Sequence, residues 1–147
     1  MNRHRYVQRI LATALLAIVS LGSLSAVARA QDAVPSTQLL VAAKAANVER
    51  VVTLLGEGVD PDTVQADGAT ALHWAAHHDD VVMADALIEA GADAGAANEF
   101  GATPLWLVAQ NGSARMVKRL LEAGADPNAA LPSGETVLMM AARTGSS

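Results

Sequence analysis

The sequence predicts an all-α fold, a solenoid of stacked helix-turn-helix units joined by hairpin-like loops. One threonine recurs every 33 residues, and each copy opens a similar apolar segment: Thr37, Thr70, Thr103 and Thr136. One glycine keeps the same period, and each copy is followed by a small residue and an aspartate: Gly58, Gly91 and Gly124. A fixed period of roughly 20 to 50 residues is typical of arrays whose units bury their apolar faces on one another. We therefore expect about three and a half such units.

The first 30 residues lie outside this period and have the pattern of a secretory signal peptide. Three arginines come first, residues 10–24 form an apolar run, and alanines follow at positions 26, 28 and 30. This pattern predicts a signal peptide over residues 1–30. Cleavage before Arg29 or before Gln31 fits the alanines, and Gln31 is favoured because Arg29 then leaves with the peptide. An uncleaved anchor is the alternative, since residues 10–28 approach the ~20 needed to span a bilayer. Both alternatives export the array, so we expect a periplasmic or secreted protein.

The 117 residues that remain are enough for one domain, over residues 34–147. Four of the ten basic residues leave with the signal peptide and all 15 acidic residues stay, so the mature charge is −9. Such a surface repels nucleic acid and anionic lipid and favours basic partners. We therefore expect no nucleic-acid partner and no membrane contact after cleavage. The chain has no cysteine, so its stability must come from stacking without disulfides.

Each threonine is expected to begin the first helix of its unit. Threonine is a good N-cap, and Pro104, directly after Thr103, suits the first helical position. Apolar residues then fill about two turns and end in small alanines that permit close helix packing. The position three residues further on should turn the chain in a left-handed conformation, which glycine adopts easily and alanine adopts only with strain. The residues at this position are Ala46, Asp79, Gly112 and Gly145.

A second helix should follow at once, because the next position always holds a good N-cap: Asn47, Asp80, Ser113 and Ser146. Apolar residues spaced three and four apart give this helix one buried stripe: Val51, Leu54 and Leu55, then Met83, Leu87 and Ile88, then Val117, Leu120 and Leu121. The periodic glycines end the helix. The stretches rich in Asp, Pro and Gly after them predict an extended, hairpin-like loop to the next unit.

This order of elements resembles the ankyrin repeat family. The family pattern D-G-x-T-P-L-H-x-A-A matches residues 67–76 with only Ala71 departing, and residues 124–128 are Gly-Ala-Asp-Pro-Asn. Together with the signal peptide, the resemblance implies an exported, bacterial-type ankyrin repeat protein. Four residues depart from the Pro and His of the pattern, which predicts weaker hydrogen bonding at helix starts: Gln38, Leu40, Trp106 and Met139. The implied repeats cover residues 34–66, 67–99, 100–132 and, in part, 133–147.

The partial fourth repeat stops at Ser147, where its second helix should begin. Terminal repeats normally present a polar outer face, whereas here the stripe of Val117, Leu120 and Leu121 would lack its covering helix. We interpret the chain as a truncated product or a fragment of a longer array. One alternative function is therefore that of a binding fragment of a larger exported protein with an effector domain beyond Ser147.

One cluster of histidines suggests a second alternative, a metal-binding protein that uses His73, His77 and His78. Two histidines four residues apart on a helix can share a metal ion. By resemblance, however, His73 takes the position of the family's own histidine, which ties neighbouring repeats together. The sequence has no nucleophile motif, no phosphate-binding glycine loop and no H-E-x-x-H. We therefore expect no enzyme, no cofactor and no metal site.

The resemblance implies that a protein partner binds the concave face, formed by the loop tips and the outer side of each first helix. Phe100 is the only phenylalanine and lies at a tip, where it can anchor a partner or fold back on the neighbouring loop. Trp74 can likewise anchor a partner or pack on the next first helix. We expect a non-catalytic protein-protein interaction scaffold. Its candidate contact residues are Trp74, His77, His78, Glu99, Phe100, Gln110 and Asn111.

Overall fold

The computed structural model describes residues 35–145, so the predicted signal peptide and the predicted cap Ser146 lie outside the described residues. This part of the chain belongs to one compact unit, and none of its helices is long and apolar enough to cross a membrane. Its helices are one over residues 35–44, then α3 (Val48–Gly56), α4 (Ala71–His78), α5 (Val81–Glu89), α6 (Pro104–Asn111), α7 (Ala114–Glu122) and α8 (Val137–Thr144).

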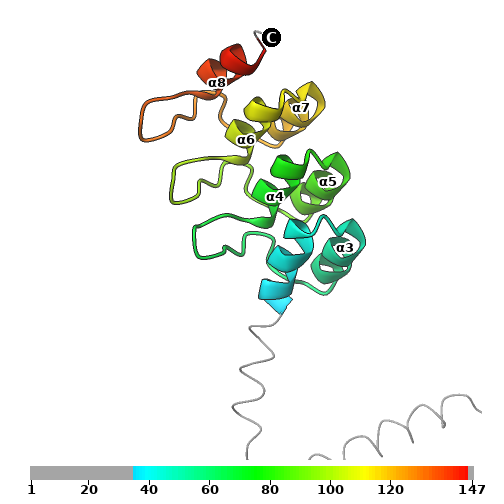
Figure 1. The fold of residues 1–147 in the computed structure, drawn as a ribbon. Coiled ribbons are helices and arrows are strands. Elements are labelled where there is room, and N and C mark those ends of the chain that lie inside the picture. The colour runs from blue at the N-terminus through cyan, green and yellow to red at the C-terminus, as the bar shows by residue number, and fades with distance from the viewer. Residues whose placement is uncertain (1–34, 146–147) are drawn as a thin grey trace, which may run out of the picture. The chain divides into compact units, whose positions relative to one another are not determined.

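The helices form two layers that run along the array (Figure 1). In the first layer α4 packs on α6 and α6 on α8, and in the second layer α3 packs on α5 and α5 on α7. The two helices of a unit also pack together, α4 with α5 and α6 with α7. Extended loops project from one side of the stack ahead of α4, α6 and α8 (Figure 1). The predicted all-α solenoid is confirmed.

The helices begin where the sequence predicts, with one exception. The first helix starts at residue 35, so Thr37 lies inside it and the prediction that Thr37 begins the helix is wrong. The reason is Pro35, because proline suits the first helical position. The other described caps are confirmed, in first helices at Thr70, Thr103 and Thr136 and in second helices at Asn47, Asp80 and Ser113.

Three of the four predicted turns are left-handed. The backbone angle φ is 54° at Ala46, 55° at Asp79 and 71° at Gly112. This conformation costs an alanine roughly 1–2 kcal/mol, so the strain predicted at Ala46 is present. Gly145 departs from the prediction, with φ of −81°. In the other units this residue turns the chain into a second helix, whereas Gly145 is the last residue that the structure describes.

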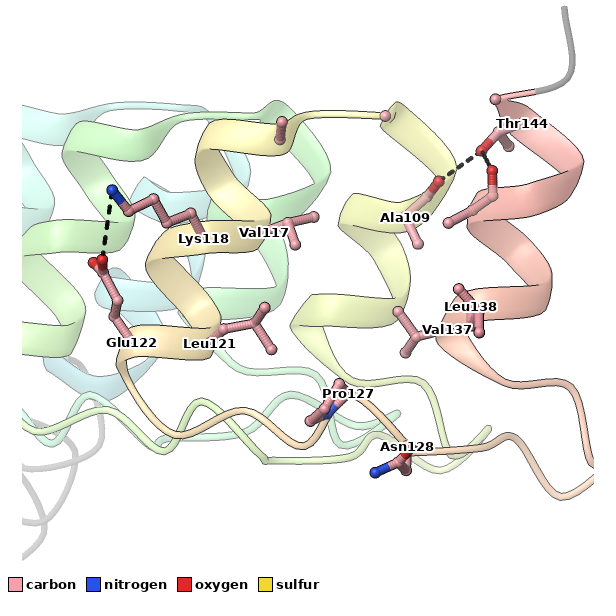
Figure 2. Close-up of a pocket in the computed structure, with 14 residues that line it drawn as sticks. Ala109, Val117, Lys118, Leu121, Glu122, Pro127, Asn128, Val137, Leu138 and Thr144 are labelled. Carbon is pink, nitrogen blue, oxygen red and sulfur yellow. Dashed lines mark hydrogen bonds and ion pairs between the residues drawn. The ribbon is translucent and has the colours of Figure 1, made fainter.

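The core lies between the two layers. One leucine of each second helix occupies the same repeat position, and its side chain is at most 1 % exposed: Leu54, Leu87 and Leu120. Each contributes ~1.5–3 kcal/mol by leaving water. Met116, which the predicted stripe omits, is also fully buried, at the repeat position of Met83. Of the stripe predicted on α7, Leu120 is buried, whereas Val117 is half-buried and Leu121 is 41 % exposed (Figure 2). The expectation that Leu120 lacks cover is therefore wrong, because Leu120 belongs to the buried core cluster.

The three loops repeat one hairpin-like turn. Backbone hydrogen bonds of 2.9–3.0 Å close them, from Gln65 to Ala69, from Asn98 to Ala102 and from Leu131 to Glu135. Neighbouring loops touch, because the backbone N–H of Glu99 donates to the carbonyl of Asp67 at 2.9 Å. A Cβ added at Gly101 would lie 2.6 Å from Pro132 of the next loop. The loop tips are therefore held in register with one another.

Candidate functional site

Trp74 is the centre of an aromatic and cationic cluster on α4. Its ring stacks on His78 with 6.2 Å between centroids and meets His77 edge-on at 5.8 Å. The ammonium group of Lys44 lies 5.3 Å from the Trp74 centroid, within cation–π range. The indole N–H donates to Oε1 of Gln65 at 3.3 Å. Trp74 is therefore oriented by contacts with its own unit and the preceding one.

A hollow of ≈ 250 Å³ opens beside Trp74, between the loops and the first helices. Leu107 of the next unit forms part of its wall, and Asp67 and Asn98 add polar groups from two loops. Asp67 accepts hydrogen bonds from the Ala69 N–H at 3.0 Å and from Gln65 Nε2 at 2.9 Å. These bonds, the one from Ala69 first, lower the pKa of Asp67, so its carboxylate stays charged. The hollow thus combines a negative charge with an aromatic ring.

His73 is buried and uses both of its ring nitrogens. Nδ1 accepts from the Thr70 backbone N–H at 3.1 Å, and Nε2 lies 3.0 Å from the carbonyl of Ala102 in the next unit. Because a backbone N–H only donates, Nδ1 carries no proton and Nε2–H is the donor to Ala102. Burial lowers the pKa of His73, against the Ala102 bond and the Asp67 charge, which raise it. The neutral ring therefore joins two units.

This geometry gives the metal-binding alternative no support. A histidine ligand needs a ring nitrogen for the metal, and both nitrogens of His73 are occupied. Nε2 of His78 lies 3.0 Å from the carbonyl of Lys44, to which it donates. His77 is exposed whereas His73 is buried, so their spacing of four does not bring two available nitrogens together. Within residues 35–145, no group of three His, Cys, Asp or Glu side chains is placed to hold a metal ion.

Two of the candidate contact residues, His78 and Asn111, are exposed and also join neighbouring units. Asn111 Nδ2 donates to two carbonyls at the end of α4, at 3.1 and 3.3 Å. His78 makes the equivalent bond to the preceding first helix, and Thr144 Oγ1 makes it to α6 at 2.9 Å. The three residues are 33 positions apart, and each satisfies a carbonyl near a helix C-terminus. In the sequence, the only signal for this shared role is that all three side chains are polar, because they are otherwise chemically unlike.

Trp106 occupies the repeat position of His73 in the next unit but cannot make the same hydrogen bonds. Its Nε1 is buried and has no hydrogen-bond partner among the residues that the structure describes. An indole has one donor and no acceptor, so it cannot accept from the backbone of its own cap as His73 does. Hydrogen bonding is therefore weaker here, as this departure from the family pattern predicts.

Phe100 is presented outward on a fixed loop tip. Its side chain is 69 % exposed. Oδ1 of Asn98 accepts from the backbone N–H groups of Phe100 and Ala102, both at 3.0 Å, and Asn98 also lines the hollow beside Trp74. Of the two alternatives for Phe100, the structure shows the exposed one. The remaining candidates, His77, Glu99 and Gln110, are exposed as well.

The comparison with known protein families agrees with this architecture. A family model of ankyrin repeats, described as three copies, matches residues 39–130 and 82–147, which together span most of the chain. A search of curated proteins finds no match. The matched residues are those that form the stacked units and their loops. The chain belongs to the ankyrin repeat family.

Proposed function

We propose that this protein is a non-catalytic scaffold outside the cytoplasm that binds a protein partner through the concave face of the array. Ankyrin repeats indicate a protein-protein interaction scaffold, and this part follows from the family. The observation that supports a binding site on the concave face is Phe100, a ring 69 % exposed on a tip whose backbone is held by Asn98. A large apolar side chain in this position contributes little to its own fold, and rigid exposed aromatics are typical interface anchors.

The charge of the surface supports a basic partner. Residues 35–113 carry 11 acidic and two basic side chains, whereas residues 114–145 carry three acidic and four basic ones. The hollow beside Trp74 lies in the acidic part, and Asp67 keeps its charge there. A lysine or arginine of the partner would find this carboxylate next to an indole ring. Such binding weakens as salt is added.

We predict that Phe100→Ala weakens partner binding tenfold or more and changes the free energy of unfolding by less than about 0.5 kcal/mol. An aromatic anchor contributes ~2 kcal/mol or more at an interface centre. An exposed ring contributes little to folding. The partner is identified by crosslinking to the exported protein, and titration calorimetry then compares the dissociation constants of the two forms.

Val82→Ala is the matched control for this variant, because Val82 is 63 % exposed on the second helix α5. It should leave the affinity unchanged. The double variant Lys118→Ala/Glu122→Ala should also be silent, since this exposed ion pair lies on α7. An affinity that ignores Phe100 but falls in the double variant would place the binding site on the second-helix layer and contradict the proposal.

The extracytoplasmic location rests on residues 1–30 and is tested separately. We predict that the exported protein begins at Gln31, because cleavage there follows a small residue and removes Arg29. N-terminal sequencing of protein recovered outside the cytoplasm checks this. Recovery of Met1 in the membrane fraction would favour the uncleaved anchor, and a chain that stays in the cytoplasm would contradict the location itself.

A further inference from the structure

The hollow beside Trp74 has the size of one side chain. Its volume of ≈ 250 Å³ is below the roughly 300–1,000 Å³ of pockets that hold drug-sized molecules. Trp74 and Leu107 give it an aromatic and an aliphatic wall, and Asp67 adds a carboxylate. A side chain that suits this hollow therefore has an apolar stem and a positively charged end.

The carboxylate of Asp67 is held in place but has no cationic partner. Gln65 connects it to the ring, because its Nε2 donates to Asp67 at 2.9 Å and its Oε1 accepts from the indole N–H of Trp74 at 3.3 Å. The backbone N–H of Ala69 donates to the other carboxylate oxygen at 3.0 Å. The three ion pairs among residues 35–145 use other carboxylates: Asp85, Glu122 and Glu135. Ring and carboxylate thus form a fixed pair whose charge no described lysine or arginine neutralises by direct contact.

We propose that this hollow binds an arginine side chain of the partner. The inference rests on the proposed function and names the side chain that this part of the concave face selects. A guanidinium group is planar and weakly hydrated, so it can stack on the indole of Trp74 and donate two N–H groups to Asp67. Each oxygen of Asp67 accepts one bond within the protein, and a carboxylate has about four acceptor positions. The methylene groups of the arginine then pack along Leu107.

Lysine suits the hollow less well. An ammonium group is a compact, strongly hydrated point charge, so it neither stacks on a ring with a planar face nor forms two parallel bonds to one carboxylate. The ammonium group of Lys44 does lie 5.3 Å from the Trp74 centroid, but Lys44 does not line the hollow. The surface that Trp74 presents to the hollow is therefore left for a second, planar cation.

The hollow adjoins the exposed ring of Phe100. Asn98 lines the hollow, and its Oδ1 accepts from the backbone N–H of Phe100 at 3.0 Å. The backbone N–H of Glu99 donates to the carbonyl of Asp67 at 2.9 Å, so the two loops are tied together. The exposed carboxylate of Glu99 adds to the negative charge here. We therefore expect a partner segment with an arginine close to an apolar side chain that contacts Phe100.

A peptide titration followed by NMR tests the hollow without an identified partner. The chain has two tryptophans, so the ¹⁵N-labelled exported protein gives two indole N–H signals, and Trp74→Phe assigns them. The peptide Gly-Arg-Gly, blocked at both ends, should shift the Trp74 signal with a dissociation constant of roughly 1–10 mM, as expected for a single side chain. It should leave the Trp106 signal in place, because Trp106 does not line the hollow.

Two further peptides separate the charge of the ligand from its shape. Blocked Gly-Lys-Gly should bind about threefold or more weakly than the arginine peptide, because an ammonium group lacks the planar fork. Citrulline has nearly the shape of arginine but no charge. A peptide with citrulline in place of arginine should therefore bind about tenfold or more weakly.

Asp67→Asn tests the carboxylate. The variant keeps the size of the side chain and an oxygen for the Ala69 N–H, and circular dichroism checks its fold. It should weaken binding of the arginine peptide by about fivefold or more. Glu49→Gln is the matched control, because it removes an equal charge from an exposed position on α3. It should change the dissociation constant by less than about twofold.

Four results would overturn the proposal. They are a Trp74 signal that the arginine peptide does not shift up to about 50 mM, a citrulline peptide or a lysine peptide that binds as tightly as the arginine peptide, and an unchanged affinity in Asp67→Asn. None of them would contradict the proposed function, which Phe100→Ala tests with the identified partner. A partner whose affinity falls in Phe100→Ala but not in Asp67→Asn would bind the concave face without an arginine in the hollow.

Discussion

His73→Ala is expected to lower the free energy of unfolding by about 3 kcal/mol at pH 7.5, measured by urea titration. The ring is 2 % exposed, and removing a large buried side chain leaves a cavity that costs ~2–5 kcal/mol. The change also leaves the carbonyl of Ala102 and the N–H of Thr70 without their imidazole partner. Each buried polar group that loses its partner costs ~1–3 kcal/mol unless water or a small shift replaces the bond.

The same variant should also loosen the coupling between units. The bond from His73 to Ala102 crosses from the second repeat to the third. Stability in such arrays is approximately a sum of unit terms and interface terms, so a weaker interface permits the two parts to unfold separately. A broader unfolding transition with a smaller dependence on urea would show this.

His73 should make the stability depend on pH in the mildly acidic range. Its folded pKa is lowered by burial below the ordinary value of 6.5, so the unfolded chain binds the proton more readily than the folded chain. The stabilisation is therefore complete above pH ~6.5 and is lost as pH falls below that value toward the folded pKa. Protonation of Nδ1 would also remove the acceptor that the Thr70 N–H requires.

His77→Ala is the control, because His77 lies on the same helix and is exposed. It should change the free energy of unfolding by less than about 0.5 kcal/mol and keep the loss of stability as pH falls below ~6.5. His73→Ala should lack that loss. If His73→Ala retained the full pH dependence, or cost less than about 1 kcal/mol, the histidine would not be the link between the units.

The helices and their caps were predictable because their causes are local. A cap and the N–H that it satisfies lie three residues apart, as from Ser113 to Met116. A sequence with a fixed period repeats that local signal, which removes much of the ambiguity of a single copy. The prediction failed at Thr37 because Pro35 is a competing start signal two residues earlier. It also failed at Gly145, whose φ of −81° is not left-handed.

The site was less predictable because its contacts join residues about one repeat apart. The bond between Asn111 and the end of α4 spans 34–35 positions, and no local pattern distinguishes an amide that joins units from one that faces a partner. The orientation of Phe100 depends on the loop backbone that Asn98 fixes. The sequence could therefore place Phe100 at a tip but could not decide between an exposed and a folded ring.

Attaching a second helix after Ser147 is expected to raise the free energy of unfolding by about 2–3 kcal/mol and the melting temperature by roughly 8 °C or more. A copy of residues 115–124 keeps the register, because Ser147 stands 33 positions after Ala114. Lysine in place of the copied Val117 and Leu121 supplies the polar outer face that terminal repeats need. The new helix would cover Leu121, 41 % exposed, and Leu138, 75 % exposed.

The gain from this helix is smaller than full burial of the last stripe, because Leu120 is already covered and the added residues must be ordered. A control helix with serine in place of the copied Met116 and Leu120 cannot pack on α7 and should leave the melting temperature unchanged. If both helices had the same effect, the exposed apolar surface would not be a missing interface.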